Sequence, residues 1–197
     1  MSVKDVFLDM VSHSTGSDET TGTSPSTPGQ KVLGAHIVEH TKSTGIEDAH
    51  MDELGYVYGT IPATDARKNT VGFIAHMDTY GGVCGENIRP QVIENYQGGT
   101  IALGTSGLSL SPAEYPALKE QVGKTLITTD GTTLLGGDAK AGVAETLCAA
   151  AEILKAGKPH GPVQLGFPPD EEIGQGADHF DVAGLGCDTA HTLARGP

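Results

Sequence analysis

Residues 71–75 read VGFIA, a continuous apolar run, and His76, Met77 and Asp78 follow it directly. A run without polar alternation is typical of a strand that is buried on both faces, as in a sheet covered by helices. In extended backbone, residues i and i+2 point to the same side, so we expect the side chains of His76 and Asp78 to converge. This stretch predicts a buried strand that ends in a polar site.

Two other segments place acidic residues beside regular structure. Residues 163–167, VQLGF, form another apolar run, and Glu171 and Glu172 follow it closely. Adjacent carboxylates at a strand end repel each other and lose hydration, a cost that a cation offsets. Asp138 lies in the segment GGDAKAG, before a helix predicted over about residues 140–155, which is rich in Ala and ends before Gly157. In open α/β sheets, sites are normally built at such strand ends.

Each cluster also has an ordinary structural interpretation. Asp138 is a good helix N-cap, and a His followed two residues later by an Asp is weak evidence for a metal. Capping does not explain why three separate segments all carry metal-competent residues. One His with several carboxylates suits zinc, and the lack of a Cys cluster argues against a structural zinc site. A bridging Asp would suggest two ions about 4 Å apart.

The other patterns predict an α/β fold with a mixed, largely parallel sheet flanked by helices. Residues 81–124 lack periodicity, so we expect irregular structure packed against the site. Residues 125–136, TLITTDGTTLLG, predict a hairpin with Asp130 and Gly131 as its two-residue turn. The remaining expected elements are helices at 3–11 and about 30–43, a loop at 12–28, strands at 49–54, 57–61, 163–167 and 189–193, and a helical turn at 177–180.

Composition narrows the classes of partner. The 197 residues suffice for one domain with a core, and their formal net charge is -13. No basic surface for nucleic acid is indicated, and an anionic membrane would repel the chain, so the acidic excess serves solubility or metal binding. Three widely spaced cysteines form neither a disulfide framework nor a Cys-x-x-Cys site. With no signal-peptide pattern and no membrane-span stretch, we expect a cytoplasmic protein.

The same clusters resemble the signature segments of the peptidase T family, the tripeptide aminopeptidases, in the same order and at similar spacing. The matching segments are HMDT (76–79), LLGGDAKAG (134–142) and PDEEIGQGADHFD (169–181). Stretches with less functional content also resemble the family: NIRPQVIENYQGGTIALG (87–104), LITTDGTTLLG (126–136) and PHGPVQLGF (159–167). The resemblance covers nearly the whole chain, more loosely before about Gly55.

The resemblance implies a dinuclear zinc peptidase that removes the N-terminal residue of a tripeptide. It assigns His76 to one Zn²⁺ ion, Glu172 to the other, and Asp138 to a bridge between them. It gives Asp78 the task of orienting the His76 ring. Glu171 would be the general base, which takes a proton from the metal-held water and passes it to the leaving amine.

The chain departs from the family pattern at several positions. Ala139 replaces an Asp that follows the bridging Asp, which weakens support for the ligands. Ala194 stands where the resemblance implies another metal-binding Asp, and Arg195 adds a positive charge beside it. The family continues beyond Pro197 into a dimerisation domain and the rest of the catalytic domain, with its last metal-binding His. Residues 1–197 would therefore be the N-terminal portion of the catalytic domain, weakly active or inactive, with exposed apolar surface that favours homo-oligomers.

Two other functions remain open on the sequence. The first is a non-catalytic fragment that binds metal weakly or serves as an interaction module. The second is a related dinuclear zinc hydrolase, a dipeptidase or an aminoacylase. The segment NIRPQVIENYQGG favours the peptidase T family over these relatives, because it is not part of the generic catalytic motifs. Zinc stoichiometry separates the enzyme from the fragment, since two tightly bound ions indicate the enzyme.

Overall fold

The computed structural model describes residues 2–66 and 68–194. The chain divides into two compact units, which are described separately below. The larger unit comprises Met1–Gly81 with Gly136–Pro197, and the smaller one is Gly82–Leu135. The candidate metal-site residues predicted from the sequence all belong to the larger unit, so its fold decides how they are arranged.

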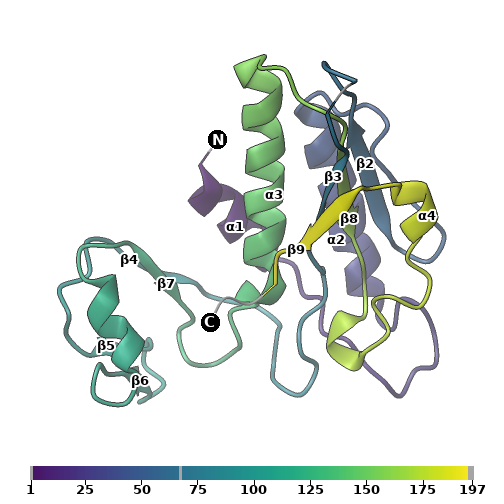
Figure 1. The fold of residues 1–197 in the computed structure, drawn as a ribbon. Helices are drawn as coiled ribbons and strands as arrows, with labels where there is room; N and C mark the ends of the chain where they lie inside the picture. The colour runs from purple at the N-terminus through teal and green to yellow at the C-terminus, as the bar shows by residue number, and fades with distance from the viewer. Residues whose placement is uncertain (1, 67, 195–197) are drawn as a thin grey trace. The chain divides into compact units, whose positions relative to one another are not determined.

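A five-stranded mixed sheet forms the centre of the larger unit (Figure 1). Its strands, in spatial order, are β1 (His50–Met51), β2 (Val57–Ile61), β8 (Val163–Phe167), β3 (Val71–Ile74) and β9 (Thr189–Thr192). Strands β8, β3 and β9 run parallel, while β2 is antiparallel to both β1 and β8. The predicted α/β fold with a mixed sheet is confirmed.

Strand β1 is much shorter than the strand predicted over residues 49–54. The Asp52 carboxylate accepts the N–H groups of Leu54 and Tyr56, each at 2.9 Å, and so closes a local turn. Gly55 completes the turn with φ 87°, a conformation that favours glycine. This side-chain hydrogen bonding competes with strand pairing and ends β1 at Met51.

Strand β3 leads directly into the candidate site residues that follow it. After Ile74, Ala75 donates its N–H to the carbonyl of Gly166, and Met77 donates to the carbonyl of Pro168. The residues that follow β3 therefore stay beside those that follow β8. Because the two strands are parallel, their polar C-terminal segments meet at the same edge of the sheet.

Helices flank this sheet. They are α1 (Val3–Val11), α2 (Pro28–Ser43), α3 (Gly137–Ala156) and the short α4 (Val182–Leu185). Helix α2 packs on β1 and β2, where Gly34 allows close approach, because a Cβ there would lie 2.6 Å from the sulfur of Met51. Helix α3 packs on β3. None of the described helices is long and apolar enough to cross a membrane.

The start of α3 positions an acidic residue. The backbone of Asp138 (φ -88°, ψ 110°) and of Ala139 (φ -110°, ψ 28°) is not helical, so the regular helix begins at Lys140. The helix ends at Gly157, whose φ of 59° is left-handed. The predicted helix over about residues 140–155, with Asp138 just before it, is confirmed. Gly142 is required there, because a Cβ would lie 2.1 Å from the Leu193 carbonyl oxygen.

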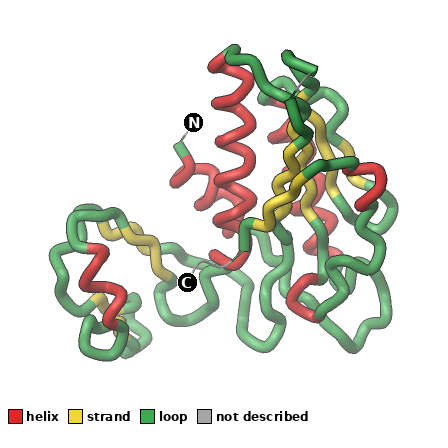
Figure 2. The backbone as a smooth tube through the Cα atoms, in the orientation of Figure 1, coloured by secondary structure: helices red, strands yellow, loops and turns green. Residues whose placement is uncertain are grey.

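The smaller unit has more order than the sequence predicted. Strand β4 (Gln91–Ile93) pairs antiparallel with β7 (Leu126–Thr128), and β5 (Ile101–Ala102) pairs with β6 (Ser109–Leu110). A 3₁₀ helix, η1 (Pro116–Gln121), and long loops complete it (Figure 2). Its small core consists of Tyr96, Ile101 and Leu103. Most of residues 81–124 are nevertheless irregular, as expected, with these short strands and η1 as the regular elements.

The hairpin predicted over residues 125–136 is wrong. Its first strand does form, as β7, but it pairs with β4 from far along the chain. Asp130 accepts hydrogen bonds from the N–H and hydroxyl of Thr132, which makes a local turn. The turn signal was correct, but the strand partner was set by contacts distant in sequence, which local turn residues do not specify.

Candidate metal centre

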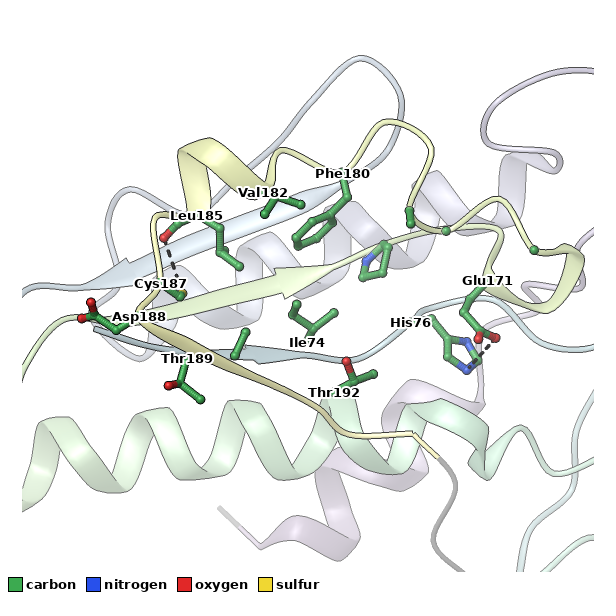
Figure 3. Close-up of a pocket in the computed structure, with 15 residues that line it drawn as sticks. Ile74, His76, Glu171, Phe180, Val182, Leu185, Cys187, Asp188, Thr189 and Thr192 are labelled. Atoms are coloured by element: carbon green, nitrogen blue, oxygen red, sulfur yellow. Dashed lines mark hydrogen bonds and ion pairs between the residues drawn. The ribbon is translucent and has the colours of Figure 1, made fainter. Parts of the chain in front are cut away.

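His76 lies at the centre of a group of carboxylates at the end of β3. Its side chain is 3% exposed, and its Nε2 atom lies 3.1 Å from Asp138 Oδ1 and 3.6 Å from Glu171 Oε2. Asp138 comes from the start of α3, and Glu171 from the 3₁₀ helix η2 (Glu171–Ile173) that follows β8. Figure 3 shows the Glu171 carboxylate directed at the His76 ring. The Asp138 side chain contacts this ring. The N-cap interpretation had instead predicted a contact with the helix backbone.

Asp78 supports the group from the other side of the ring. It is fully buried, and its two carboxylate oxygens accept the N–H groups of Glu171 and Glu172, each at 3.0 Å. The Nδ1 atom of His76 lies 3.1 Å from the Asp78 carbonyl oxygen and 3.3 Å from its Oδ1. The Nδ1 proton is directed to Asp78, so Nε2, which faces Asp138 and Glu171, is the ring atom that a metal ion would bind after displacing its proton.

The donor set fits a divalent metal ion. His76, Asp138 and Glu172 each offer one ligand atom, and these three atoms lie within 4.8 Å of one another. Zinc–ligand distances near 2 Å place neighbouring ligand atoms about 3.3 Å apart, so small side-chain movements would bring all three within reach of bound zinc. An imidazole with two carboxylates suits a borderline metal such as zinc.

The charges of the site favour an added cation. Burial lowers the pKa of His76, but the hydrogen bond and charge of Asp78, together with the Glu171 charge, outweigh it and raise that pKa to about 9. Burial raises the pKa of the Glu172 carboxyl, His76 opposes this, and the negative charge of Asp138 adds to it. The two shifts differ in their main cause, but the negative charge of neighbouring carboxylates contributes to both, and a proton or a metal ion relieves that charge.

Asp170 is a buried residue that the sequence did not single out from its acidic neighbours. Its carboxylate accepts the N–H of Ser26 at 2.8 Å, the Ser26 hydroxyl at 2.5 Å and the Gln30 amide at 2.7 Å. Gln30 also accepts the Asp170 N–H at 3.0 Å. This network ties the residue before η2 to the start of α2. No local pattern reveals it, because Ser26 lies in a segment that reads as a loop.

Replacing Asp170 with alanine is expected to destabilise the chain by about 3 kcal/mol, because buried donors of Ser26 and Gln30 lose a charged acceptor. Urea unfolding followed by circular dichroism measures this. Asp178→Ala is the control, since Asp178 is exposed in the next turn and its loss should change the free energy of unfolding by less than about 0.5 kcal/mol. Equal stabilities for the two variants would contradict a structural role for Asp170.

Lys140 is a second buried residue that the sequence did not single out. Its side chain is fully buried, and its Nζ atom donates to the carbonyl of His13 at 2.6 Å. Burial lowers its pKa to about 8, while the charge of Asp78 acts in the opposite direction. A buried cation therefore lies near the buried Asp78 carboxylate and offsets part of its charge.

The two alanines noted in the sequence differ in their surroundings. Ala139 is fully buried, whereas Ala194 is exposed. The β3–β9 register pairs Ile74 with Thr192, and Leu193 donates its N–H to the Ile74 carbonyl at 2.7 Å. Ala194 thus follows β9 as His76 follows β3, at the same edge of the sheet, and its methyl group offers no ligand. Arg195 lies outside the described residues.

An apolar pocket of about 500 Å³ opens beside His76 and Glu171 (Figure 3). Its apolar lining includes Ile74, Pro168, Ala177, Phe180, Val182 and Leu185. Strand β9, which forms one side of it, is exposed along its whole length, and Val182 is 72% exposed. The candidate metal centre therefore lies next to an open apolar surface of the larger unit.

Several solved structures share this fold. An aminopeptidase PepT from Bacillus cereus matches with a TM-score of 0.70 at 22% identity, covering 99% of this chain and 43% of that one. A tripeptidase from Staphylococcus aureus matches with a TM-score of 0.68 at 24% identity, over 99% and 43% of the two chains. An aminoacylhistidine dipeptidase from Vibrio alginolyticus follows at 0.58 and 20% identity, over 98% and 32%. The chain therefore shares its α/β fold with these solved peptidases.

The sequence relatives identify the family more specifically than the solved structures do. Peptidase T of Halothermothrix orenii is 48% identical over 99% of this chain, and peptidase T of Clostridium perfringens is 47% identical over 98%. The chain belongs to the peptidase T family. It spans about half the length of these curated relatives, 48% in both cases. No protein-family model matches the chain.

Proposed function

We propose that residues 1–197 supply part of the two-zinc site of an aminopeptidase that removes the N-terminal residue from tripeptides. The observation that carries the proposal is the convergence of His76, Asp138 and Glu172, with ligand atoms within 4.8 Å of one another. These residues come from three separate segments of a fold shared with aminopeptidases. Membership of the peptidase T family supports the choice of a small peptide as substrate.

The proposal gives each residue a role that its geometry supports. His76 and Glu172 would each hold a zinc ion, and Asp138 would contribute its carboxylate to both. Asp78 orients the His76 ring through Nδ1 and also holds the backbone of Glu171 and Glu172. When bound, zinc polarises a peptide carbonyl and lowers the pKa of a bound water.

Glu171 is the proposed general base. Its side chain is 56% exposed, so water and a peptide can reach its carboxylate, and its Oε2 atom lies 3.6 Å from the ligand His76. The carboxylate would accept a proton from water at Oε2 and later donate that proton to the leaving amine. Adjacent Glu172, which is less exposed, serves as the ligand, so the two carboxylates divide the tasks according to their environments.

The described residues supply an incomplete ligand set for two ions. Ala194 offers no carboxylate where the resemblance implies one, and the chain spans about half the length of its relatives. The assignment of residues 1–197 to a portion of a catalytic domain remains part of this proposal. A cytoplasmic location is also part of this proposal, and it agrees with the free state of Cys84, Cys148 and Cys187.

The chain by itself is expected to hydrolyse tripeptides with a kcat below about 0.1 s⁻¹, roughly a hundredfold under a typical enzyme. Too few ligands leave zinc loosely held, and a displacement of about 1 Å between water and peptide costs about this factor. Release of the N-terminal residue, followed with excess zinc, measures the rate. Glu171→Gln is the control. A kcat near 10 s⁻¹ for the unsubstituted chain, lost in this variant, would overturn the expectation of a weakly active site.

A non-catalytic interaction fragment is the second candidate function. The exposed strand β9 and the apolar pocket beside it favour this candidate, because such a surface promotes association, including formation of homo-oligomers. Zinc stoichiometry and sedimentation equilibrium separate the two. One weakly bound ion or none at the His76 centre, in a chain that associates through this surface, supports the fragment. Two ions bound tightly at the His76 centre support the enzyme, and dipeptide or N-acyl substrates then distinguish related zinc hydrolases.

A further inference from the structure

A second group of metal-competent side chains lies on α1 and α2, outside the proposed peptidase site. The Asp9 carboxylate lies 2.7 Å from Nε2 of His36, and the rings of His13 and His36 have centroids 4.7 Å apart. One ligand atom from each of these three residues lies within 4.8 Å of the other two. Among the described residues, this group and the one at His76 are those that meet this criterion.

The backbone holds these side chains in place. Asp9 lies in the last turn of α1, and His13 follows four residues later, where its N–H still bonds to the Met10 carbonyl at 3.3 Å. Residues four apart along helical backbone share one face. Met10 on α1 and Ile37 on α2 are fully buried, which anchors both segments beside the ligand positions. The three candidate ligands are therefore presented by packed elements.

We propose that Asp9, His13 and His36 form a second metal site, which binds Zn²⁺ or a similar divalent transition-metal ion. Two imidazole nitrogens and one carboxylate oxygen are ligands that such ions prefer, and water would complete the coordination. The ion would link the end of α1 to the middle of α2. This site is independent of the proposed aminopeptidase function.

The ionisation of the group agrees with this assignment. Burial, followed by the charge of His36, lowers the pKa of His13, so its imidazole is neutral at neutral pH and carries a free lone pair. Burial and His36 also lower the pKa of His40, one turn further along α2. Neutral imidazoles bind metal ions without first releasing a proton.

Two features affect how tightly an ion is held. Asp9 and His36 are 46% and 32% exposed, which leaves a path for an ion to enter. The 2.7 Å contact between them must open to about 3.3 Å around a zinc ion, and the ion replaces their shared proton. The ammonium of Lys140 opposes binding by its charge, but it donates to the His13 carbonyl and occupies none of the ligand atoms.

The test counts zinc ions bound by the full chain, using isothermal titration and equilibrium dialysis. His36→Gln and His13→Gln are each expected to reduce the stoichiometry by one and to leave the ion at His76 in place. His40→Gln is the matched control, because His40 lies on the same helix outside the group of three and should leave the stoichiometry unchanged. An unchanged count in both His36→Gln and His13→Gln would overturn the proposal.

A measurement on the unsubstituted chain avoids any effect of these substitutions on folding. Paramagnetic Co²⁺ is titrated while the histidine ring resonances are followed by NMR. The rings of His13 and His36 are expected to shift or broaden in a saturable manner, with Zn²⁺ reversing the effect. If Co²⁺ perturbs His76 alone, the second site does not exist. If it perturbs His13 and His36 but not His76, the second site stands and the proposed peptidase centre fails.

Discussion

His76→Ala is expected to lower zinc affinity at the proposed peptidase centre by about a hundredfold or more, the largest effect we anticipate from a single substitution. The substitution removes the imidazole and leaves Asp138 and Glu172, two carboxylates at most 4.8 Å apart, without a neutral ligand. It also leaves the buried Asp78 carboxylate without its ring partner. Competition between the chain and a zinc-binding dye measures the change.

Two further variants make this prediction specific. His191→Ala removes a histidine from exposed strand β9, where its ring stacks on Phe73 with centroids 6.1 Å apart, and it should leave zinc affinity unchanged. Asp138→Asn keeps the size of a ligand side chain but removes its charge, and it should weaken binding without opening a cavity. Zinc affinities equal to those of the unsubstituted chain in both His76→Ala and Asp138→Asn would refute the centre. The ion proposed at His36 should persist in all three variants.

Ala194→Asp is expected to strengthen zinc binding at the same centre by about tenfold or more, with a second ion bound there. The register pairs Ile74 of β3 with Thr192 of β9, and the Leu193 N–H continues this pairing to the Ile74 carbonyl. Position 194 therefore lies at the sheet edge beside His76. A carboxylate placed there adds an oxygen ligand to a site that is short of one. Isothermal titration with zinc gives both the affinity and the count.

Ala190→Asp is the control for this gain. It adds the same charge to the same strand, but four residues earlier, about 13 Å from position 194. A general electrostatic attraction for cations would improve binding in both variants, whereas a new ligand improves it only at position 194. Equal zinc binding by Ala194→Asp and Ala190→Asp would contradict the placement of a ligand there.

Local signals were sufficient to predict the elements that carry the peptidase site. The apolar run at 71–75 predicted strand β3, because burial on both faces removes the need for polar alternation. The Ala-rich segment predicted α3, and Asp138 lies just before its regular part, as expected. The proximity of His76 to Asp138 was expected from the position of His76 at a strand end and of Asp138 at a helix start. Their roles as ligands remain predictions.

Pairings between distant segments could not be predicted in this way. The turn at Asp130 was read correctly, yet β7 pairs with β4 instead of with the residues after the turn. The Asp170 carboxylate is bound by Ser26 and Gln30, although nothing near Asp170 in sequence indicates those partners. The same holds for Asp9 and His36, which come together only because two helices pack in one unit.

The sequence by itself determined the class of fold, the segments that form its main strands and helices, and the residues of the candidate centre at His76. It did so because backbone periodicity, burial and helix propensity depend on residues that are close together in the sequence. The tertiary structure alone decided the order inside residues 82–135, the buried Asp170 network and the group at Asp9, His13 and His36. These depend on which distant surfaces pack together, and that choice is made by the burial of the whole core.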